Sequence, residues 1–590
     1  MKKIINKPEH IVSDMCSGIV LANDKLLLNS KYKVIRKKEM NKSKVTLISG
    51  GGSGHEPAHA GFIGKGLLDA AVCGDVFASP SQIQVYQAIR ETASDKGTLL
   101  IIKNYSGDMM NFQNAMLMAQ EDGLLVDYVN VDDDIAVQDS LYTVGRRGVA
   151  GTIFVHKIAG AAAEKGLPLP EVKRIAEKVI ANVKSIGFAL SSCTVPAKGS
   201  PIFDLGEQEM EYGVGIHGEP GIIRERVVDA QELAGRMVGS LCNELKLKTD
   251  LAARVEILIN GFGATPLMEL YVLNKEVICE LSGKGITVTR SLVGSFMTSI
   301  DMMGASVSIL KLDDELEDLL NAPCESLALN ISGDTSDVVY REFFEKDQKC
   351  DEVSYEVETP KSHAEIGKEL TLDNMIYIVD VMSESIIRNE VPFCEIDSHA
   401  GDGDFGMSVS KGFRQLKKEW KTIVEDSELT ISGFLSSCSL VLMEHCGGAS
   451  GPIWGSAFRA AGKSTAGKDL LTVGDFADML QSAIEGIQAT GERSFGRGAV
   501  VGDKTLIDAL VPCADAWKAC TSIESDFKTA FHEGAASAVE GAEKTKRIVA
   551  HMGRAGTAGE RSLGFPDAGA YGLGVVFTAV AKAVQEKMSL

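Results

Sequence analysis

The chain has 590 residues, a mass of 63.0 kDa and a formal net charge of -21 at neutral pH. This length exceeds what one hydrophobic core usually serves, and 45% hydrophobic with 24% charged residues is typical of a folded protein rather than a disordered one. The acidic balance argues against nucleic acid and anionic lipid as partners, because binding either would require a basic patch.

The cysteines and the first residues of the chain indicate the cellular compartment of the protein. The 12 cysteines are scattered without a CxxC pair, and several, such as Cys73, Cys279 and Cys438, lie in apolar runs. This pattern favours reduced thiols. The opening MKKIINKPEH has no apolar run behind its lysines, and no later stretch reaches the roughly 20 apolar residues that a membrane span needs. We therefore expect a cytoplasmic protein without membrane or nucleic-acid partners.

Short apolar runs alternate with helical patterns in the first half of the chain, which predicts α/β layers. A first set of strands is expected at Val45–Ile48, Thr98–Ile102 and Leu125–Val131. A helical stretch at Ala230–Leu245 precedes a second set at Val255–Ile259, Ile286–Arg290 and Ser306–Leu310. Residues 1–340 are therefore predicted to form an α/β domain of two lobes, with the break near residues 190–250.

The second half has a different pattern. Residues 341–366 are polar and mixed in charge, which predicts a linker. Residues 367–590 are predicted to form an all-helical domain, because apolar residues recur at helical spacing between glycine-rich turns. The clearest such segments are Leu372–Arg388, Thr430–Glu444, Val473–Thr490 and Phe527–Met552.

A glycine run, SGGGSGHEP from Ser49 to Pro57, follows the apolar segment VTLI. Its backbone could approach a small polar ligand closely, and a flexible turn is the alternative. The run continues into HEPAH, which formally fits the HExxH zinc-protease motif. Pro57 and the upstream glycines argue against the regular helix which that motif requires.

A second motif that fits a known signature only in part is GKST at Gly462–Thr465, which resembles the end of a P-loop. Six residues, rather than the required four, separate Gly455 from Gly462. An ATP site in this chain would therefore be built without a P-loop.

The strongest local signal is the carboxylate loop EIDSHAGDGDFG, which contains Asp397, Asp402 and Asp404. Its glycines permit a tight loop in which the three carboxylates converge on divalent ions, and without a cation their charges would repel. Mg²⁺ takes few protein carboxylates beside substrate phosphates, so the pattern favours magnesium held with a nucleotide. A solvated acidic loop is the alternative, and a calcium loop is disfavoured because the EF-hand spacing is missing.

Three further glycine loops follow in the helical half, at Gly447–Gly451, Gly502–Thr505 and Gly553–Gly556. At one end of a helical domain, such loops would place helix N-termini where backbone amides bind phosphate oxygens. Individually each could be only a turn.

Together these motifs resemble the ATP-dependent dihydroxyacetone kinase (glycerone kinase) family, in its single-chain form with both K-type and L-type domains. The resemblance runs nearly end to end and is carried by SGGGSGHEPAHAGFIGKG, KNYSGD, GRRG, GIHGEPG, AGDGDFG, GGASG and GDKTLIDAL. It implies a first, dihydroxyacetone-binding α/β domain of two lobes and a second, ATP-binding all-α helical barrel. It also implies transfer of a phosphoryl group from Mg-ATP to a hydroxyl of dihydroxyacetone, giving dihydroxyacetone phosphate.

The resemblance further implies roles for individual residues. His217 would hold the ketone as a hemiaminal, and His55 and Asp108 would be the candidates for the general base. The residues around the substrate would be Gly52, Ser53, Gly54, His55, Lys103 and Asp108. The ligands of two Mg²⁺ ions would be Asp397, Asp402 and Asp404. The nucleotide contacts would be Asp402, Gly403, Asp404, Phe405, Gly448, Ala449, Gly491, Thr505, Leu506, Asp567, Ala568 and Gly569.

Two positions depart from the family pattern: Ala449 replaces a common hydroxyl residue and Ala568 replaces the usual proline. The resemblance also implies a homodimer, for which we expect crossed domains. Alternatives remain open: a kinase of a related keto sugar such as erythrulose, and a side activity as a cyclising lyase that splits FAD into AMP and cyclic FMN. A sugar-binding regulator is disfavoured by the intact AGDGDFG loop. A phosphocarrier-dependent kinase is disfavoured because that form normally uses separate chains.

Overall fold

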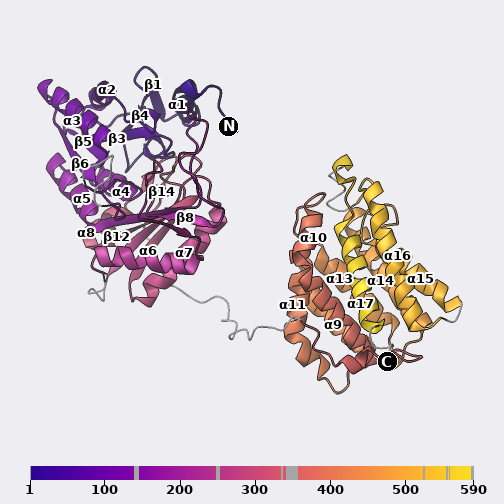
Figure 1. The fold of residues 1–590 in the computed structure, drawn as a ribbon. Helices are drawn as coiled ribbons and strands as arrows, with labels where there is room; N and C mark the ends of the chain where they lie inside the picture. Colours follow the sequence, from indigo (N-terminus) through magenta and orange to yellow (C-terminus); the bar gives the residue numbers. More distant parts are fainter. Residues whose placement is uncertain are drawn as a thin grey trace. The chain divides into compact units, whose positions relative to one another are not determined.

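The computed structural model describes residues 2–137, 145–247, 253–333, 337–339, 356–522, 525–552, 556 and 559–585, without the side chains of Ser494 and Phe495. The chain divides into two compact units, Met1–Phe343 and Phe344–Leu590 (Figure 1). The first unit is α/β and the second is helical, which confirms the predicted fold class. Most of the predicted linker, residues 341–355 of 341–366, lies outside the described residues.

The first sheet of the α/β unit has the strand order β1-β2-β4-β3-β5-β6. Strands β4, β3, β5 and β6 are parallel, and β1 and β2 extend the sheet in antiparallel fashion. The strands are β1 (Leu26–Asn29), β2 (Val34–Lys37), β3 (Thr46–Ser53), β4 (Ala70–Val76), β5 (Thr98–Lys103) and β6 (Val126–Val131). Apolar side chains of α2 (Gln82–Thr92) and α3 (Ser106–Glu121) cover one face, and those of α4 (Thr152–Glu164) and α5 (Leu169–Asn182) the other.

The glycine run is part of a strand, not only a loop. Strand β3 continues through Gly50, Gly51 and Gly52 to Ser53 because β4 pairs with this part of it, whereas the pairing with β5 ends at Ser49. A Cβ atom at Gly50 would lie 2.5 Å from the carbonyl oxygen of Val72, and one at Gly52 would lie 2.7 Å from the amide nitrogen of Ala78. The glycines therefore permit close backbone packing where the strand reaches the site.

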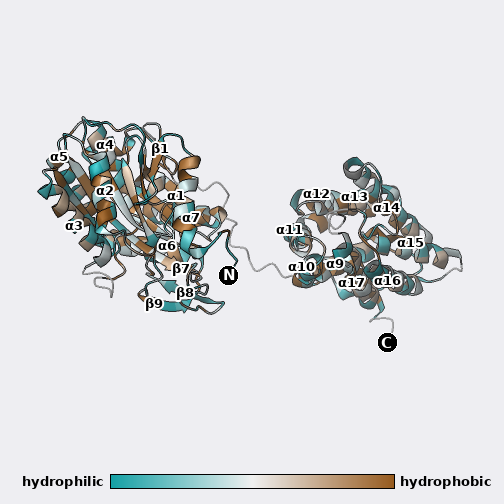
Figure 2. Cartoon of the chain, turned by 90° about the horizontal axis from the view of Figure 1, so that it is seen from above, coloured by the Kyte–Doolittle hydropathy of each residue, from teal (hydrophilic) through white to brown (hydrophobic). Residues whose placement is uncertain are grey.

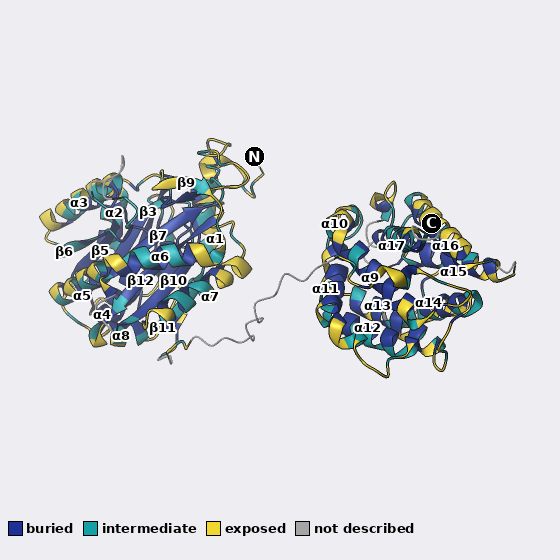
Figure 3. Cartoon of the chain, turned by 60° about the horizontal axis from the view of Figure 1, so that its bottom comes forward, coloured by how far each residue is buried: buried dark blue, intermediate teal, exposed yellow. Residues whose placement is uncertain are grey.

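The second sheet has the order β11-β10-β12-β7-β8-β9 and begins at Val183, earlier than the interval of 190–250 predicted for the break. Helices α6 (Ala230–Glu244) and α7 (Leu267–Gly283) cover one face, and α4, α5 and α8 (Asp314–Asn321) pack toward the other, so both sheets share one core (Figure 3). The strands are β7 (Val183–Ala189), β8 (Glu209–Tyr212), β9 (Ile223–Arg226), β10 (Arg254–Gly261), β11 (Thr287–Gly294) and β12 (Gly304–Leu312).

The helical unit is a ring in which each helix packs against the next along the chain and α17 returns to α9. Amphipathic helices, polar outside and apolar inside (Figure 2), surround a cavity of about 110 Å³ with an apolar lining. The ring helices are α9 (Leu372–Arg388), α11 (Phe405–Val424), α12 (Ile431–His445), α13 (Ser450–Ser464), α14 (Val473–Phe495), α15 (Ile507–Ser522), α16 (Phe527–Lys544) and α17 (Ala568–Gln585). Helix α16 ends at Lys544, before the predicted Met552, because a 3₁₀ turn follows at Thr545–Arg547.

Helix α17 is long and apolar enough to cross a membrane by length and composition alone. Half of that stretch is buried inside the unit, where it packs against α9 and α16. Its hydropathy is therefore accounted for by its place in the ring.

Candidate active site

Two histidines that are far apart in sequence meet in the α/β unit. His55 lies just after β3, and its Nε2 atom is 3.0 Å from Nε2 of His217. The other ring nitrogen of His55, Nδ1, is 2.7 Å from the carbonyl oxygen of Thr298. Burial lowers the pKa of His55 well below its usual value, and the charges of Lys103 and His217 lower it further. Burial therefore disfavours the charged form of the His55 imidazole.

His217 is held by Glu219, two residues later in the same loop. The His217 backbone N–H donates to Oε2 of Glu219 at 2.8 Å, and His217 Nδ1 lies 2.9 Å from Oε1. Burial alone would raise the pKa of Glu219, but His217 and Arg147 lower it to about 2. The rings of Phe77 and Tyr105 stand edge-on to the His217 ring, with centroids 5.0 and 4.7 Å away. The imidazole is thus fixed on several sides.

A cavity of about 710 Å³ opens against His217, whose side chain is 20% exposed. The backbone of the glycine run, the start of α3 and the loop after β7 form its walls. The other lining residues are Gly52, Phe77, Ser79, Tyr105, Ser106, Gly107, Asp108, Ile202, Phe203, Gly218, Glu219 and Pro220. The cavity is large enough for a short sugar.

Lys103 and Asp108 are buried beside the glycine run. A Cβ atom at Gly51 would lie 3.3 Å from Lys103 Nζ and 3.4 Å from Asp108 Oδ2. Burial lowers the pKa of Lys103 and raises the pKa of Asp108, the latter against the opposing charge of Lys103. Lys103 Nζ and Asp108 Oδ1 have no hydrogen-bond partner among the described residues. Such buried polar atoms are suited to ligand hydroxyls.

Two of the residues predicted around the substrate, Ser53 and Gly54 at the end of β3, do not line the cavity at His217. Ser53 and Gly54 line a separate cavity together with Glu56, and the Ser53 hydroxyl donates to the carbonyl oxygen of Gly74 at 2.7 Å. Their predicted contact with the substrate stays a prediction. The HEPAH segment is a turn without regular helix, so it cannot place two histidines on one helical face.

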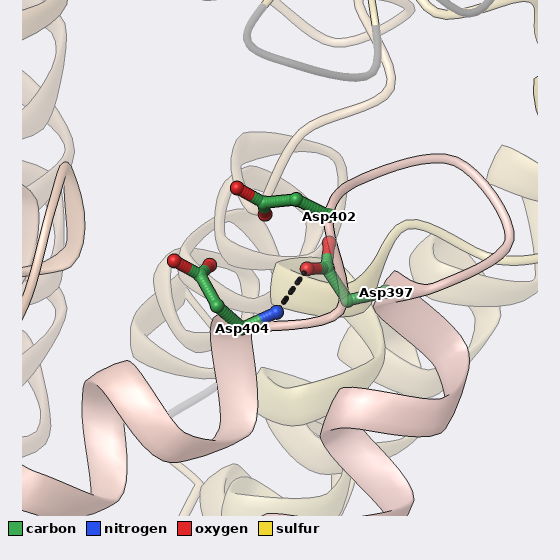
Figure 4. Close-up of side chains that lie close together, drawn as sticks. All are labelled: Asp397, Asp402 and Asp404. Carbon is green, nitrogen blue, oxygen red and sulfur yellow. Dashed lines mark hydrogen bonds between the residues drawn. The ribbon is translucent and has the colours of Figure 1, made fainter. Parts of the chain in front are cut away.

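In the helical unit, Asp397, Asp402 and Asp404 form one cluster (Figure 4). Each offers a carboxylate oxygen within 4.8 Å of the others. Asp397 ends α10 (Glu390–Asp397), and its Oδ2 accepts the N–H groups of Gly403 and Asp404 at 2.9 and 3.1 Å. Partial burial raises the pKa of Asp397, and the charges of Asp402 and Asp404 raise it further. Hard oxygen ligands with mutual repulsion fit a divalent cation such as Mg²⁺.

Other predicted nucleotide residues gather at the same end of the ring. Because the short connections alternate helix direction, α11, α13, α15 and α17 all begin there. Ser408 of α11 donates to the carbonyl oxygen of Gly447 at 2.7 Å, which joins the start of α11 to the loop before α13. A Cβ atom at Gly569 would lie 3.1 Å from Cβ of Leu506, which joins α17 to α15. Several helix N-termini with phosphate-binding capacity therefore meet.

The remaining predicted nucleotide residues follow this arrangement. Ala449 caps α13, Thr505 donates its N–H to Asp508 at 2.8 Å, and Ala568 begins α17. Burial and the charge of Asp508 raise the pKa of Asp567 to about 7. Gly448 adopts a left-handed φ of 54°, and Gly491 lies in the last turns of α14. Of the predicted loop Gly553–Gly556, residues 553–555 lie outside the described residues.

Comparison with known proteins assigns a family to both units. Residues 17–328 match the Dak1 domain and residues 399–582 match the DAK2 domain. The chain is 49% identical, over 56% of its length and all of the relative's, to the dihydroxyacetone-binding subunit of a PTS-dependent dihydroxyacetone kinase of Listeria innocua. It is 34% identical to the L-erythrulose 1-kinase of Mycolicibacterium smegmatis, over 98% of this chain and 99% of the relative.

A solved structure covers both units. The dihydroxyacetone kinase of C. freundii in complex with AMP-PNP and Mg²⁺ aligns with 98% of this chain and 99% of its own, at 30% identity and a TM-score of 0.58. The chain therefore belongs to the dihydroxyacetone kinase family, in the form that carries the Dak1 and DAK2 domains on one polypeptide.

Proposed function

We propose that this protein is a kinase of short keto sugars which transfers the γ-phosphoryl group of Mg-ATP to a hydroxyl of dihydroxyacetone and forms dihydroxyacetone phosphate. One observation carries the proposal: a single chain holds both a partly exposed imidazole that faces a sugar-sized cavity and a three-carboxylate cluster among helix N-termini. The end-to-end similarity to a short-ketose kinase supports it. The similarity to the C. freundii kinase in its complex with AMP-PNP and Mg²⁺ supports ATP as the donor and Mg²⁺ as the cation.

In the proposed site, Nε2 of His217 adds to the ketone carbon and holds the sugar as a hemiaminal. Only a carbonyl compound can form this adduct, so glycerol is excluded. Lys103 and Asp108 bind the sugar hydroxyls with the atoms that have no partner among the described residues. Asp108 and His55 are the two candidates for the base that removes the proton from the attacking hydroxyl.

Asp397, Asp402 and Asp404 hold two Mg²⁺ ions in the proposed nucleotide site. When bound, the ions neutralise the charge of the transferring phosphoryl group. The backbone N–H groups at the start of α13 receive the phosphate oxygens. We further propose that the protein is cytoplasmic and acts as a homodimer with crossed domains, in which one protomer's helical unit serves its partner's sugar site.

The first experiment supplies ATP as the only phosphoryl donor and measures dihydroxyacetone phosphate. His217→Ala is expected to lose the covalent adduct and keep Mg-nucleotide binding. Asp402→Asn is expected to weaken Mg-nucleotide binding and keep the adduct. Intact-protein mass spectrometry reads the adduct, and calorimetric titration reads nucleotide binding. Normal turnover in both variants would show that these residues are wrongly assigned.

The second experiment decides which ketose is preferred. It compares kcat/KM for dihydroxyacetone, glyceraldehyde and both enantiomers of erythrulose. The additional hydroxymethyl group of erythrulose changes the fit to the cavity rather than the chemistry, so we expect a difference of about 1–3 kcal/mol between ketoses. Sugar binding without any consumption of ATP would instead identify a regulator.

A further inference from the structure

Four groups form a continuous hydrogen-bonded series through the sugar site. Glu219 Oε1 lies 2.9 Å from His217 Nδ1, the Nε2 atoms of His217 and His55 are 3.0 Å apart, and His55 Nδ1 is 2.7 Å from the carbonyl oxygen of Thr298. The four residues come from three separate loops. The first and last groups of the series are both hydrogen-bond acceptors.

The acceptors at the two ends determine where the protons lie. A carbonyl oxygen can only accept, so His55 must donate from Nδ1 to Thr298. The Glu219 carboxylate is charged and likewise accepts, so His217 donates from Nδ1. Each neutral ring then carries its lone pair on Nε2, and two lone pairs facing each other at 3.0 Å do not form a hydrogen bond. The contact is satisfied only when one additional proton lies between the two Nε2 atoms.

We propose that Glu219 is a positioning residue, which selects the Nδ1–H tautomer of His217 and thereby leaves the Nε2 lone pair available to the ketone carbon. The proposal rests on the hemiaminal capture proposed above. Glu219 touches His217 rather than the sugar carbon, so it acts through the imidazole. Glu219 follows His217 by two residues in the GIHGEPG motif, and it contacts both the ring and the backbone of that histidine.

The packing around Glu219 holds its carboxylate in place. A Cβ atom at Gly215 would lie 2.1 Å from Glu219 Oε2 and 2.6 Å from Arg147 Nη1, so only glycine leaves room for this pair. Arg147 itself is fully buried and is bonded to Asp134. The carboxylate therefore cannot turn away from His217 without displacing buried groups.

The capture step balances with the protons that this series holds. The Nε2 lone pair of His217 forms the bond to the carbonyl carbon, and the C=O π electrons move to oxygen. The shared proton passes fully to His55 Nε2 as the sugar enters, which frees the His217 lone pair for this attack. His55 then donates the proton to the new oxyanion and completes the hydroxyl of the hemiaminal. The alkylated ring keeps Nδ1–H and one positive charge, which the Glu219 carboxylate offsets, and His55 is left neutral.

The decisive variant is Glu219→Gln, which keeps shape and size. The His217 backbone N–H still needs an acceptor, so the amide oxygen takes that place and the NH₂ group faces Nδ1. This inverts the tautomer and puts hydrogen on Nε2. We expect adduct formation to weaken by up to about 10⁴-fold, the size of the rate loss that a wrong histidine tautomer causes in a catalytic triad. ¹³C NMR of dihydroxyacetone labelled at C2 reads the ketone against the tetrahedral carbon on the full-length protein.

Glu211→Gln is the matched control. Glu211 is also buried and anchors the same loop by accepting the N–H of Gly221 at 3.0 Å, but its hydrogen bonds are to Gly221 and Arg224 rather than to His217. We expect this variant to keep the tetrahedral carbon signal and the wild-type KM. Thermal unfolding and Mg-nucleotide binding should be unchanged in both variants.

Three results would overturn the proposal. An adduct as tight in Glu219→Gln as in the wild type would show that Glu219 does not select the tautomer. An equal loss of the adduct in Glu211→Gln would show that the effect of Glu219→Gln comes from general loosening of the loop. If the wild-type enzyme phosphorylated the sugar without any tetrahedral carbon signal, the hemiaminal itself would be wrong and this inference would fall with it, whereas the kinase activity would stand.

Discussion

Lys504 shows how one buried side chain can hold a site together. Its ammonium nitrogen lies 2.5 to 3.2 Å from four backbone carbonyl oxygens, which share its three N–H groups. The acceptors are Thr545, Ile548, Ser562 and Phe565. Lys504 lies just before α15, so it ties the start of that helix to the segment that leads into α17.

Replacing Lys504 by methionine should destabilise the helical unit by about 3 kcal/mol, because four buried carbonyl groups lose a charged donor. Urea unfolding followed by tryptophan fluorescence measures this unit alone, since all three tryptophans, Trp420, Trp454 and Trp517, belong to it. Lys463→Met, at an exposed position of α13, should leave the midpoint unchanged. Equal midpoints for the two variants would contradict this account.

Glu256 is a buried acid in the α/β unit that the proposed chemistry does not use. Its carboxylate oxygens have no hydrogen-bond partner among the described residues, and the nearest ion-pair partner, Arg290, is 4.0 Å away. Burial raises the pKa of Glu256 to about 8, and Arg290 and Lys157 only partly oppose this. The folded protein therefore holds a proton at neutral pH that the unfolded chain releases.

The sign of the pH effect follows from that proton. Because the folded pKa is raised from 4.5 to about 8, the folded state binds more protons in this range and stability falls as pH rises through it. Glu256→Gln removes the effect. The free energy of unfolding of Glu256→Gln minus that of the wild type should increase by about 3 kcal/mol from pH 5 to pH 8, because only the wild type loses this stability. Hydrogen exchange of β10 peptides reads this unit, and a difference that did not vary with pH would refute the assignment.

At the scale of residues, the sequence predicts what is local and misses what the fold assembles. The carboxylates of Asp397, Asp402 and Asp404 share one short loop, and the structure brings them within 4.8 Å. His55 and His217 are 162 positions apart, so no spacing rule could place their Nε2 atoms together. Glu219 lies in the GIHGEPG motif, but its contact with His217 follows only from the geometry of the loop. Lys504 had no sequence signal beyond its place in the GDKT segment.

At the scale of elements, helices α15 and α16 approach each other closely at two glycines of α16. A Cβ atom at Gly541 would lie 2.1 Å from the carbonyl oxygen of Asp508, and one at Gly534 would lie 2.5 Å from Nε1 of Trp517. Both glycines face α15 because they are seven residues apart, which is about two helical turns. Asp508 also holds the turn before α15 by accepting the N–H groups of Gly502 and Thr505.

Gly541→Ala should therefore push the two helices apart and destabilise the helical unit by about 2 kcal/mol. Gly474→Ala is the control in the same unit, since the nearest atom to its Cβ would be at an ordinary distance of 3.5 Å. The control is expected to be neutral or slightly stabilising. Tryptophan fluorescence in urea distinguishes the two, and an unaffected Gly541→Ala would show that the helices can repack.

The predicted elements were most accurate where hydrophobic periodicity was long. Helix α9 spans the predicted Leu372–Arg388, and β5, β6 and β10 lie within about two residues of their predicted ends. Strands β1, β2, β8 and β9 have four residues each and too little alternation to be predicted from sequence. The sequence predicts a ligand-binding loop or a turn at the glycine run; glycine disfavours strands, but pairing with β4 overrides that preference.

At the scale of the whole molecule, the two parts of the proposed site belong to different units with separate hydrophobic cores. The sugar cavity lies in the first unit and the carboxylate cluster in the second. Phosphoryl transfer requires the two to meet, and a crossed homodimer is one arrangement that would achieve this.

Complementation between two inactive variants tests the crossed arrangement. Protomers carrying His217→Ala are mixed with protomers carrying Asp402→Asn under conditions that exchange subunits. In a crossed dimer each mixed pair has one intact site, so random exchange should restore about a quarter of the wild-type activity. Transfer within one chain would restore none, and gel filtration with light scattering confirms that dimers are present.

The closure of the helical ring has a consequence for how the protein is made. The ring is complete only when α17 packs against α9, nearly 200 residues earlier in the chain. The described strands of the α/β unit, by contrast, have all left the ribosome once Ile331 has emerged. During synthesis the first unit can thus fold completely before the last helix of the second unit has been made. A nascent chain would form the proposed sugar site well before the proposed nucleotide site. A chain truncated before α17 would therefore bind the sugar without phosphorylating it.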